Sequence, residues 1–377
     1  MNVYLDNAAT TPVAKEVVEA MVPVLADTFG NPSSSHAFGR RAKVQVEQAR
    51  RRIARHLNCA PASIIFTSGG TEADNLALRA AVRDLGCARI ITSAAEHSAV
   101  VKTAESLAKS NGIVVDYVRH EADGVCDLAY LEQLLQEDKG KTMVSLMHAN
   151  NEVAVLQDLQ AIGDLCRRHN ALFHSDTVQT MCHYAFDLAA LPVDFITCAA
   201  HKFHGPKGVG FLYAAQGLKF AGQIEGGGQE RALRGGTENT AGIVGLATAM
   251  DLAYRDLAGH QAHVRALKAR MADGLRARFP DVRFNGDSDK TDRLYTVLNV
   301  QFPPHPKSGM ALFLLDLEGI ACSGGSACSS GATLGSHVLR ALDFHDPTRA
   351  SVRFSFSRYT TEDEVDRALA AVEKVFG

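Results

Sequence analysis

The sequence predicts an α/β protein with a mainly parallel β-sheet, helices on both faces of the sheet, and a smaller α+β domain. From about residue 63 to residue 215, short apolar strands alternate with helical patterns, an order typical of parallel strands joined by crossover helices. After Gly235-Gly236-Thr237 the alternation stops, and strands and longer helices follow in mixed order. We therefore expect a large domain at 15–255 and a small domain formed by 1–14 and 256–377.

The expected strands of the large domain are apolar runs bounded by turn residues: 64–66, 89–92, 113–117, 143–147, 171–174, 193–196 and 209–213. Helical patterns fill the connections at 71–83, 97–109, 128–136 and 159–169. Only a short turn separates the last strand from the preceding loop, so this strand is expected to run antiparallel. Beyond it we expect helices at 242–254 and 260–279, a strand at 295–300, a helix at 309–318, a strand at 351–355 and a helix from 361.

Composition excludes several classes of partner. The chain has 377 residues, 46% of them hydrophobic, and a formal net charge of −3, so neither nucleic acid nor an anionic membrane is an expected partner. No apolar run approaches the roughly 20 residues of a membrane span, and the N-terminus lacks signal-peptide features, so a cytoplasmic protein is expected. The eight cysteines include no Cys-x-x-Cys pair, and His174, His201, His204 and Cys322 are not at a zinc spacing, so no metal is expected.

Lys202 and Asp176 are the residues with the clearest chemical meaning. Lys202 lies on a glycine-containing loop, and Asp176 ends an earlier apolar strand. A lysine amine can attach pyridoxal 5′-phosphate (PLP) covalently, and a carboxylate can keep the ring nitrogen of PLP protonated, so that the ring accepts electrons. A buried carboxylate needs a cationic partner, which the ring nitrogen supplies, although a helix cap or a structural salt bridge is the plainer interpretation of Asp176.

Cys328 differs from the other cysteines because it lies in Gly324-Gly325-Ser326-Ala327-Cys328-Ser329-Ser330-Gly331. Reactive cysteines favour accessible, flexible settings, whereas the other cysteines lie in apolar surroundings typical of inert core thiols. An incidental loop thiol is the alternative interpretation, and the PLP residues make it the weaker one. An electron-accepting ring and a nucleophilic sulfur together predict chemistry at a sulfur-containing amino acid.

Further candidates lie just after expected strands, where ligands bind in open α/β sheets. Gly70 and Thr71 open a helix whose free N–H groups can hold a phosphate, or they form only a tight turn with Thr71 as helix cap. His97 can stack on a pyridine ring and exchange protons, or simply satisfy a hydrogen bond. Gln179 can reach the phenolate oxygen of PLP, and Asn151 follows another strand; each alone suits an ordinary surface or turn position.

Ordered motifs narrow the assignment further. They are distributed over essentially the whole length of the chain: 4–12, 29–34, 67–72, 148–152, 201–208, 234–239 and 351–355. In these motifs and in their order, the chain resembles the fold-type I PLP-dependent enzymes. Within these enzymes, it resembles the cysteine desulfurases of the NifS/IscS-like class. The segment around Cys328 resembles the long catalytic loop of that class.

This resemblance implies a residue-by-residue assignment. Lys202 would hold PLP, Asp176 would pair with the ring nitrogen, Gln179 would contact the phenolate and His97 would stack on the ring. The other implied contacts are Gly70, Thr71 and His201 for the phosphate, Asn151 beside the cofactor, Arg353 and Asn31 for the substrate carboxylate, and Thr237 for the phosphate of the second subunit of a homodimer. The implied substrate is L-cysteine, with Cys328 receiving its sulfur for delivery to an acceptor protein such as an iron–sulfur scaffold.

Departures from the family pattern concern the phosphate contact and the loop. Ala199 stands where the family often has serine, Gly325 replaces a common serine, and Thr333-Leu334-Gly335 replaces a segment that often reads Leu-Glu-Pro. These changes bear on cofactor affinity, transfer rate and acceptor choice rather than on the type of reaction. The enzymatic alternative is a selenocysteine lyase or another PLP-dependent β-elimination enzyme. The alternative of another class is an inactive paralogue that acts as a docking subunit.

Overall fold

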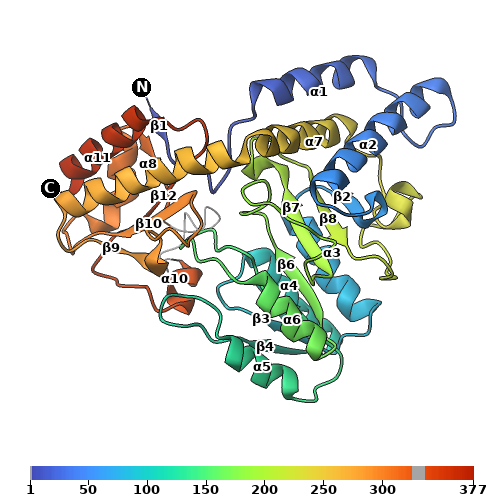
Figure 1. Ribbon diagram of the computed structural model, residues 1–377, viewed down its shortest axis with the longest axis horizontal. Coiled ribbons are helices and arrows are strands. Elements are labelled where there is room, and N and C mark those ends of the chain that lie inside the picture. Colours follow the sequence, from blue (N-terminus) through green and yellow to red (C-terminus); the bar gives the residue numbers. More distant parts are fainter. Residues whose placement is uncertain (1, 325–335) are drawn as a thin grey trace.

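The computed structural model describes residues 2–324 and 336–377, which form a larger and a smaller unit side by side (Figure 1). The larger unit is built on a seven-stranded sheet with an apolar core on each face, and the smaller unit has its own core under the long helix α8 (Leu257–Arg278). None of the helices in the described part of the chain combines the length and the apolar composition that crossing a bilayer requires.

The seven-stranded sheet has the strand order β2-β8-β7-β6-β5-β3-β4. The strands are β2 (Ile64–Thr67), β3 (Arg89–Thr92), β4 (Val114–Tyr117), β5 (Thr142–Ser145), β6 (Leu172–Asp176), β7 (Phe195–Ala199) and β8 (Gly210–Ala214). Strand β8 pairs antiparallel with β2 and β7, and every other pair in this sheet is parallel. The mainly parallel sheet and the antiparallel last strand expected from the sequence are confirmed.

Helices cover both faces of this sheet because successive residues of each strand point to opposite sides. Ile65, Ile90 and Met143 pack under α3 (Gly70–Arg83) and α4 (Ser98–Asn111). The neighbouring residues Ile64 and Ile91 join the opposite core. That side is covered by α1 (Lys15–Asp27), α2 (Ala37–His56), α5 (Leu128–Gln136), α6 (Leu159–Arg168) and α7 (Thr240–Arg255). The alternation from 63 to 215 did not indicate α1 and α2, which precede it.

The smaller unit contains a three-stranded antiparallel sheet of order β12-β10-β9 and a two-stranded parallel sheet of β1 and β11. Its elements are β1 (Val3–Tyr4), β9 (Arg283–Phe284), β10 (Val297–Gln301), α9 (Ala311–Leu317), β11 (Ile320–Ala321), α10 (His337–Ala341), β12 (Ser351–Ser355) and α11 (Glu362–Phe376). Val3 and Leu5 belong to the same apolar core as α8 and α11, so the N-terminal segment packs with the C-terminal part of the chain. The domain boundaries themselves stay a prediction.

A buried ion pair anchors the edge strand β2. Two nitrogens of Arg50 donate to the two carboxylate oxygens of Glu230, at 2.8 and 2.6 Å. Arg50 also donates to the carbonyl oxygen of Ile64 at 2.8 Å, and Glu230 accepts from the amide of Phe66 at 2.9 Å. Because both ionic side chains are buried, each depends on the other for its charge. The pair thereby holds the strand that leads directly into the Gly70 turn.

Candidate active site

A cavity of about 240 Å³ lies at the carboxyl edge of the parallel strands. Nine of the site residues expected from the sequence line it: Gly70, Thr71, His97, Asn151, Asp176, Gln179, His201, Lys202 and Arg353. Most of them follow parallel strands, and the carboxyl ends of such strands meet at one edge of a sheet. The local strand-to-loop pattern therefore brings together residues that are far apart in the sequence.

The Lys202 side chain is held by the N-terminal segment. Lys202 ends the short 3₁₀ helix after β7, and its Nζ donates to the carbonyl oxygens of Ala8 and Ala9 at 2.5 and 2.9 Å. His201 Nδ1 lies 3.1 Å from the hydroxyl of Thr10. Burial, together with the neighbouring lysine, lowers the pKa of His201 to about 4, so its ring is neutral at physiological pH. The N-terminal motif thus presents backbone acceptors directly to the lysine amine.

Asp176 is the last residue of β6 and is buried. One carboxylate oxygen accepts from the amide of Val178 at 2.8 Å. Burial and, to a smaller extent, the carboxylate of Asp74 raise the pKa of Asp176 to about 6, although His97 partly opposes the shift. Within the described residues, no lysine or arginine forms an ion pair with Asp176. The carboxylate therefore has an environment that suits a cationic ligand group.

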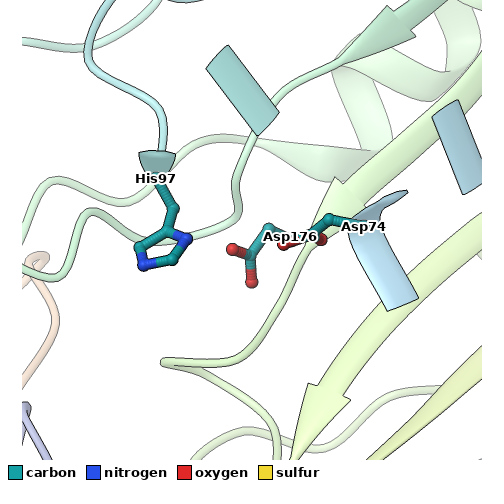
Figure 2. Close-up of side chains that lie close together, drawn as sticks. All are labelled: Asp74, His97 and Asp176. Atoms are coloured by element: carbon teal, nitrogen blue, oxygen red, sulfur yellow. The ribbon is translucent and has the colours of Figure 1, made fainter. Parts of the chain in front are cut away.

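His97 lies beside Asp176 and caps the N-terminus of α4 (Figure 2). Its Nδ1 accepts from the amide of Ala99 at 3.2 Å. Burial lowers the pKa of His97, an effect that Asp176 partly opposes. In the neutral ring, the acceptor role of Nδ1 places the proton on Nε2. His97 is thus suited to stack on a ring and to donate the proton on Nε2. To accept a proton at Nδ1, it would have to give up the capping hydrogen bond from the Ala99 amide.

The turn before α3 has the properties of an anion site. Gly69 has φ of +154°, and a Cβ on Gly70 would lie 2.8 Å from Cγ2 of Val178. The backbone can therefore approach a ligand closely, and the first N–H groups of the helix are available to it. Thr71 lies inside the helix and Gly69 is the N-cap, so the alternative in which Thr71 only caps the helix is wrong. Ala199 lines the same cavity without offering a hydroxyl.

Arg353 enters the cavity from β12 of the smaller unit and is 1% exposed. Its Nη1 donates to the carbonyl oxygen of Asn151 at 2.9 Å. Its Nη2 donates to Asp6 Oδ1 and to Ser323 Oγ, both at 2.8 Å. Its Nε is buried and has no hydrogen-bond partner in the part of the chain that the structure describes. Arg353 thus brings to the cavity a fixed guanidinium with one unpaired N–H, which suits an incoming carboxylate.

Two expected residues lie outside this cavity. Asn31 is exposed, and its side chain accepts from the amide of Ser33 at 2.9 Å in a local turn. Thr237 is exposed and lines a separate cavity of about 230 Å³ beside Ser68. Cys328 lies outside the described residues. Their roles stay predictions.

Sequence reasoning missed Asp74, which lines the cavity and is 1% exposed. Asp74, His97 and Asp176 each place one potential ligand atom within 4.8 Å of the other two. A signal for Asp74 was present in the sequence. It follows Gly70 by four residues, one turn along the helix, and interrupts a face that is otherwise alanine and leucine. Asp6 was also missed, and its carboxylate contacts Arg353.

Comparison with known proteins places this site in a family. The class-V aminotransferase family (Aminotransferase class-V) matches residues 3–368. "Cysteine desulfurase IscS" of Clostridium botulinum (strain Hall) is 39% identical over 377 residues, covering 99% of this chain and 94% of that protein. A solved "NifS-like protein" has a TM-score of 0.90 at 36% identity, covering 100% and 99% of the two chains. The structure titled "SspA in complex with cysteine" has a TM-score of 0.82 at 31% identity, covering 95% and 100%.

The fold and the site therefore define a member of the class-V aminotransferase family, to which this chain belongs. Within that family the chain belongs with the cysteine desulfurases of the NifS/IscS group. The family and the fold class expected from the sequence motifs are confirmed, and so is the assignment of the chain to an enzyme family. Enzymes of this family use PLP.

The donors and acceptors around the cavity fit that cofactor. The Lys202 amine suits its aldehyde, and a pyridinium N–H would satisfy the Asp176 carboxylate, which has no cationic side-chain partner among the described residues. The open N-terminus of α3 suits its phosphate group. The fit rests on this combination of an amine, a buried carboxylate and an anion site around one cavity.

Proposed function

We propose that this chain is a PLP-dependent cysteine desulfurase, which converts L-cysteine to L-alanine and retains the sulfur as a persulfide on Cys328. The observation that carries the proposal is that Lys202, Asp176 and Arg353 line the same cavity. The first two suit the cofactor, and the third suits the carboxylate of an amino acid.

The residues that would hold PLP follow from their positions. Lys202 would attach the cofactor, Asp176 would pair with the ring nitrogen, and His97 would stack on the ring. Gln179 would contact the phenolate, and Gly70, Thr71 and His201 would hold the phosphate. When bound, PLP supplies an electron-accepting ring that stabilises negative charge at the α-carbon of an amino acid. The Lys202 amine, once freed, is placed to take the α-proton, because it already lies in the cavity against Ala8 and Ala9.

The substrate would be oriented by its carboxylate. The guanidinium of Arg353 would bind it, while Asp6, Ser323 and the carbonyl of Asn151 keep that guanidinium fixed. Asn151 would lie beside the cofactor, and Asn31 would approach the substrate carboxylate. The relative described as being in complex with cysteine supports L-cysteine as the substrate.

The sulfur step balances without an external oxidant. The Cys328 thiolate attacks the substrate sulfur, an S–S bond forms as the C–S bond breaks, and the electron pair remains with the carbon fragment. Protonation of that fragment then gives alanine. The nearby Cys322 is not suited to this role, because burial raises its pKa to about 12. Sulfur would pass from Cys328 to an acceptor protein, such as an iron–sulfur scaffold.

A homodimer is part of this proposal. The α1 residues Val18, Val22 and Leu25 share one helix face and are exposed, and the exposed rings of Phe29 and Phe38 contact one another, with centroids 5.3 Å apart. An exposed apolar surface of this kind is typical of a protein interface. Thr237 would contact the phosphate held by the second subunit, which is compatible with its exposure outside the cavity of its own chain.

Incubation with L-cysteine and PLP tests the proposal, with alanine and protein-bound sulfane sulfur measured by mass spectrometry. We expect equal amounts of alanine and persulfide in the first turnover, with the extra sulfur on Cys328. Cys328→Ala should abolish both, whereas the control Cys322→Ala should leave both unchanged. Undiminished alanine production by Cys328→Ala would contradict the proposal, as would wild-type protein that binds no PLP.

A further inference from the structure

Two buried carboxyl groups lie side by side at the cavity, and one ring nitrogen cannot pair with both. Asp74 and Asp176 are 1% and 8% exposed, and each places an oxygen within 4.8 Å of the other (Figure 2). Within the described residues, neither has a lysine or arginine partner. One ring nitrogen can supply one positive charge. The second carboxyl group must therefore find another way to remain buried.

Asp74 is not neutralised by its histidine neighbour. His174 Nε2 lies 3.5 Å from Asp74 Oδ1, but the two ring nitrogens are already engaged with Ser145 Oγ at 2.8 Å and Thr197 Oγ1 at 3.1 Å. Burial lowers the pKa of His174 to about 4, so this ring is neutral at physiological pH. Hence His174 contributes no positive charge to Asp74.

The surroundings of Asp74 suit a protonated carboxyl group. Burial raises the pKa of Asp74 to about 7, an effect that a side-chain hydrogen bond from Thr197 only partly opposes, and its buried Oδ1 has no hydrogen-bond partner among the described residues. Asp176, in contrast, accepts from the Val178 amide and faces the cavity where a ring nitrogen would bind. Two like charges this close cannot both be retained in a buried site, and the one without a cationic or N–H partner is the one that takes up a proton.

We propose that Asp74 is a positioning residue for the cofactor's ring nitrogen. In its protonated form it donates a hydrogen bond to Asp176, and the two carboxyl groups share one negative charge. A separation within 4.8 Å allows this bond to form through one water or after a small rotation of the Asp74 side chain. Asp74 thereby holds the acceptor oxygen of Asp176 in place and limits its basicity, so that the proton stays on the ring. This inference deepens the proposed function and depends on PLP binding.

The test compares two replacements of Asp74. Asp74→Asn keeps a neutral donor of the same size, whereas Asp74→Ala removes it. PLP is titrated into each cofactor-free protein, and the dissociation constant is obtained from the visible absorbance of the bound cofactor. We expect Asp74→Asn to remain within about twofold of the wild type and Asp74→Ala to bind about tenfold more weakly, as for a lost hydrogen bond to a charged group. Asp164→Asn, on an exposed part of α6, controls for the loss of an aspartate elsewhere.

A second measurement separates positioning from simple structural support. The pH at which the absorbance of the bound cofactor changes should move by about one unit in Asp74→Ala and stay near the wild-type value in Asp74→Asn. The other titratable groups that face the pair are Glu96, His97, His174 and Lys202, and both variants retain all of them. The unfolding temperature of the cofactor-free protein reports any loss of packing in the Asp74→Ala variant.

Each outcome has a defined meaning. The inference is overturned if Asp74→Asn loses affinity as severely as Asp74→Ala, because Asp74 would then act through a negative charge. It is also overturned if Asp74→Ala lowers only the unfolding temperature and leaves the absorbance titration unchanged. If wild-type protein binds no PLP, the proposed function fails first, so the two failures can be told apart.

Discussion

Replacing Arg353 by lysine should weaken L-cysteine binding while sparing cofactor binding. The guanidinium contacts three groups at once, namely the Asn151 carbonyl, Asp6 and Ser323, and it still has an unpaired Nε for a ligand. A lysine ammonium keeps the charge but cannot satisfy those acceptors and bind a carboxylate in the same geometry. A hydrogen bond between charged groups contributes about 1.5–3 kcal/mol, which corresponds to a roughly 10- to 150-fold loss of affinity.

The assay is a spectral titration of the PLP-loaded Cys328→Ala protein, in which the sulfur step cannot proceed. L-cysteine should bind about 10- to 150-fold more weakly when Arg353→Lys is added. The methyl ester of L-cysteine, which has no carboxylate, should bind equally to both proteins. PLP affinity should also be unchanged. Equal weakening for the acid and the ester, or no weakening for either, would refute the assignment of Arg353 to the substrate carboxylate.

Three further outcomes are expected. Glu230→Gln removes one partner of the buried ion pair that holds the edge strand, and it should lower the unfolding free energy by about 3–5 kcal/mol in urea titrations. The control Glu47→Gln, at a partly exposed contact of the same arginine, should lower it by less than about 1 kcal/mol. Equal losses of unfolding free energy in the two variants would contradict the argument. Gly70→Ala places a Cβ 2.8 Å from a valine methyl and should weaken PLP binding about tenfold by calorimetry, unlike Gly228→Ala, whose Cβ meets open space. In Asp176, burial raises the pKa to about 6 from an unfolded value near 4, so its ionisation destabilises the cofactor-free fold as pH rises. Asp176→Asn should therefore gain about 2 kcal/mol over the wild type between pH 4 and pH 7, and a difference independent of pH would contradict this.

Much of the site could be predicted because it depends on local order. Lys202 and His97 each follow a parallel strand that is recognisable from its apolar run, Asp176 ends another, and the carboxyl ends of such strands meet at one edge. Gly70 opens a helix after a strand, which identifies an anion site without knowledge of the remaining fold. For these residues the strand-helix alternation was sufficient, although it did not indicate α1 and α2, which lie before the repeating pattern.

Other parts of the site were decided by contacts between distant segments. Arg353 reaches the cavity because β12 pairs antiparallel with β10, and its guanidinium is then fixed by Asp6 from the opposite end of the chain. Lys202 likewise depends on a distant segment, because its amine donates to the carbonyls of Ala8 and Ala9 near the N-terminus. Such contacts leave no periodic signal in either segment.

The sequence by itself therefore determined the alternating fold, the family and the chemical types of the principal site residues, because strand and helix patterns and ordered motifs are local properties. Only the tertiary structure decided which charges share the cavity. Asp74 is an ordinary helical aspartate in the sequence, and it becomes a buried neighbour of Asp176 only when α3 packs against β6. The charge of a carboxyl group depends on what surrounds it in three dimensions, and its neighbours along the chain do not specify those surroundings.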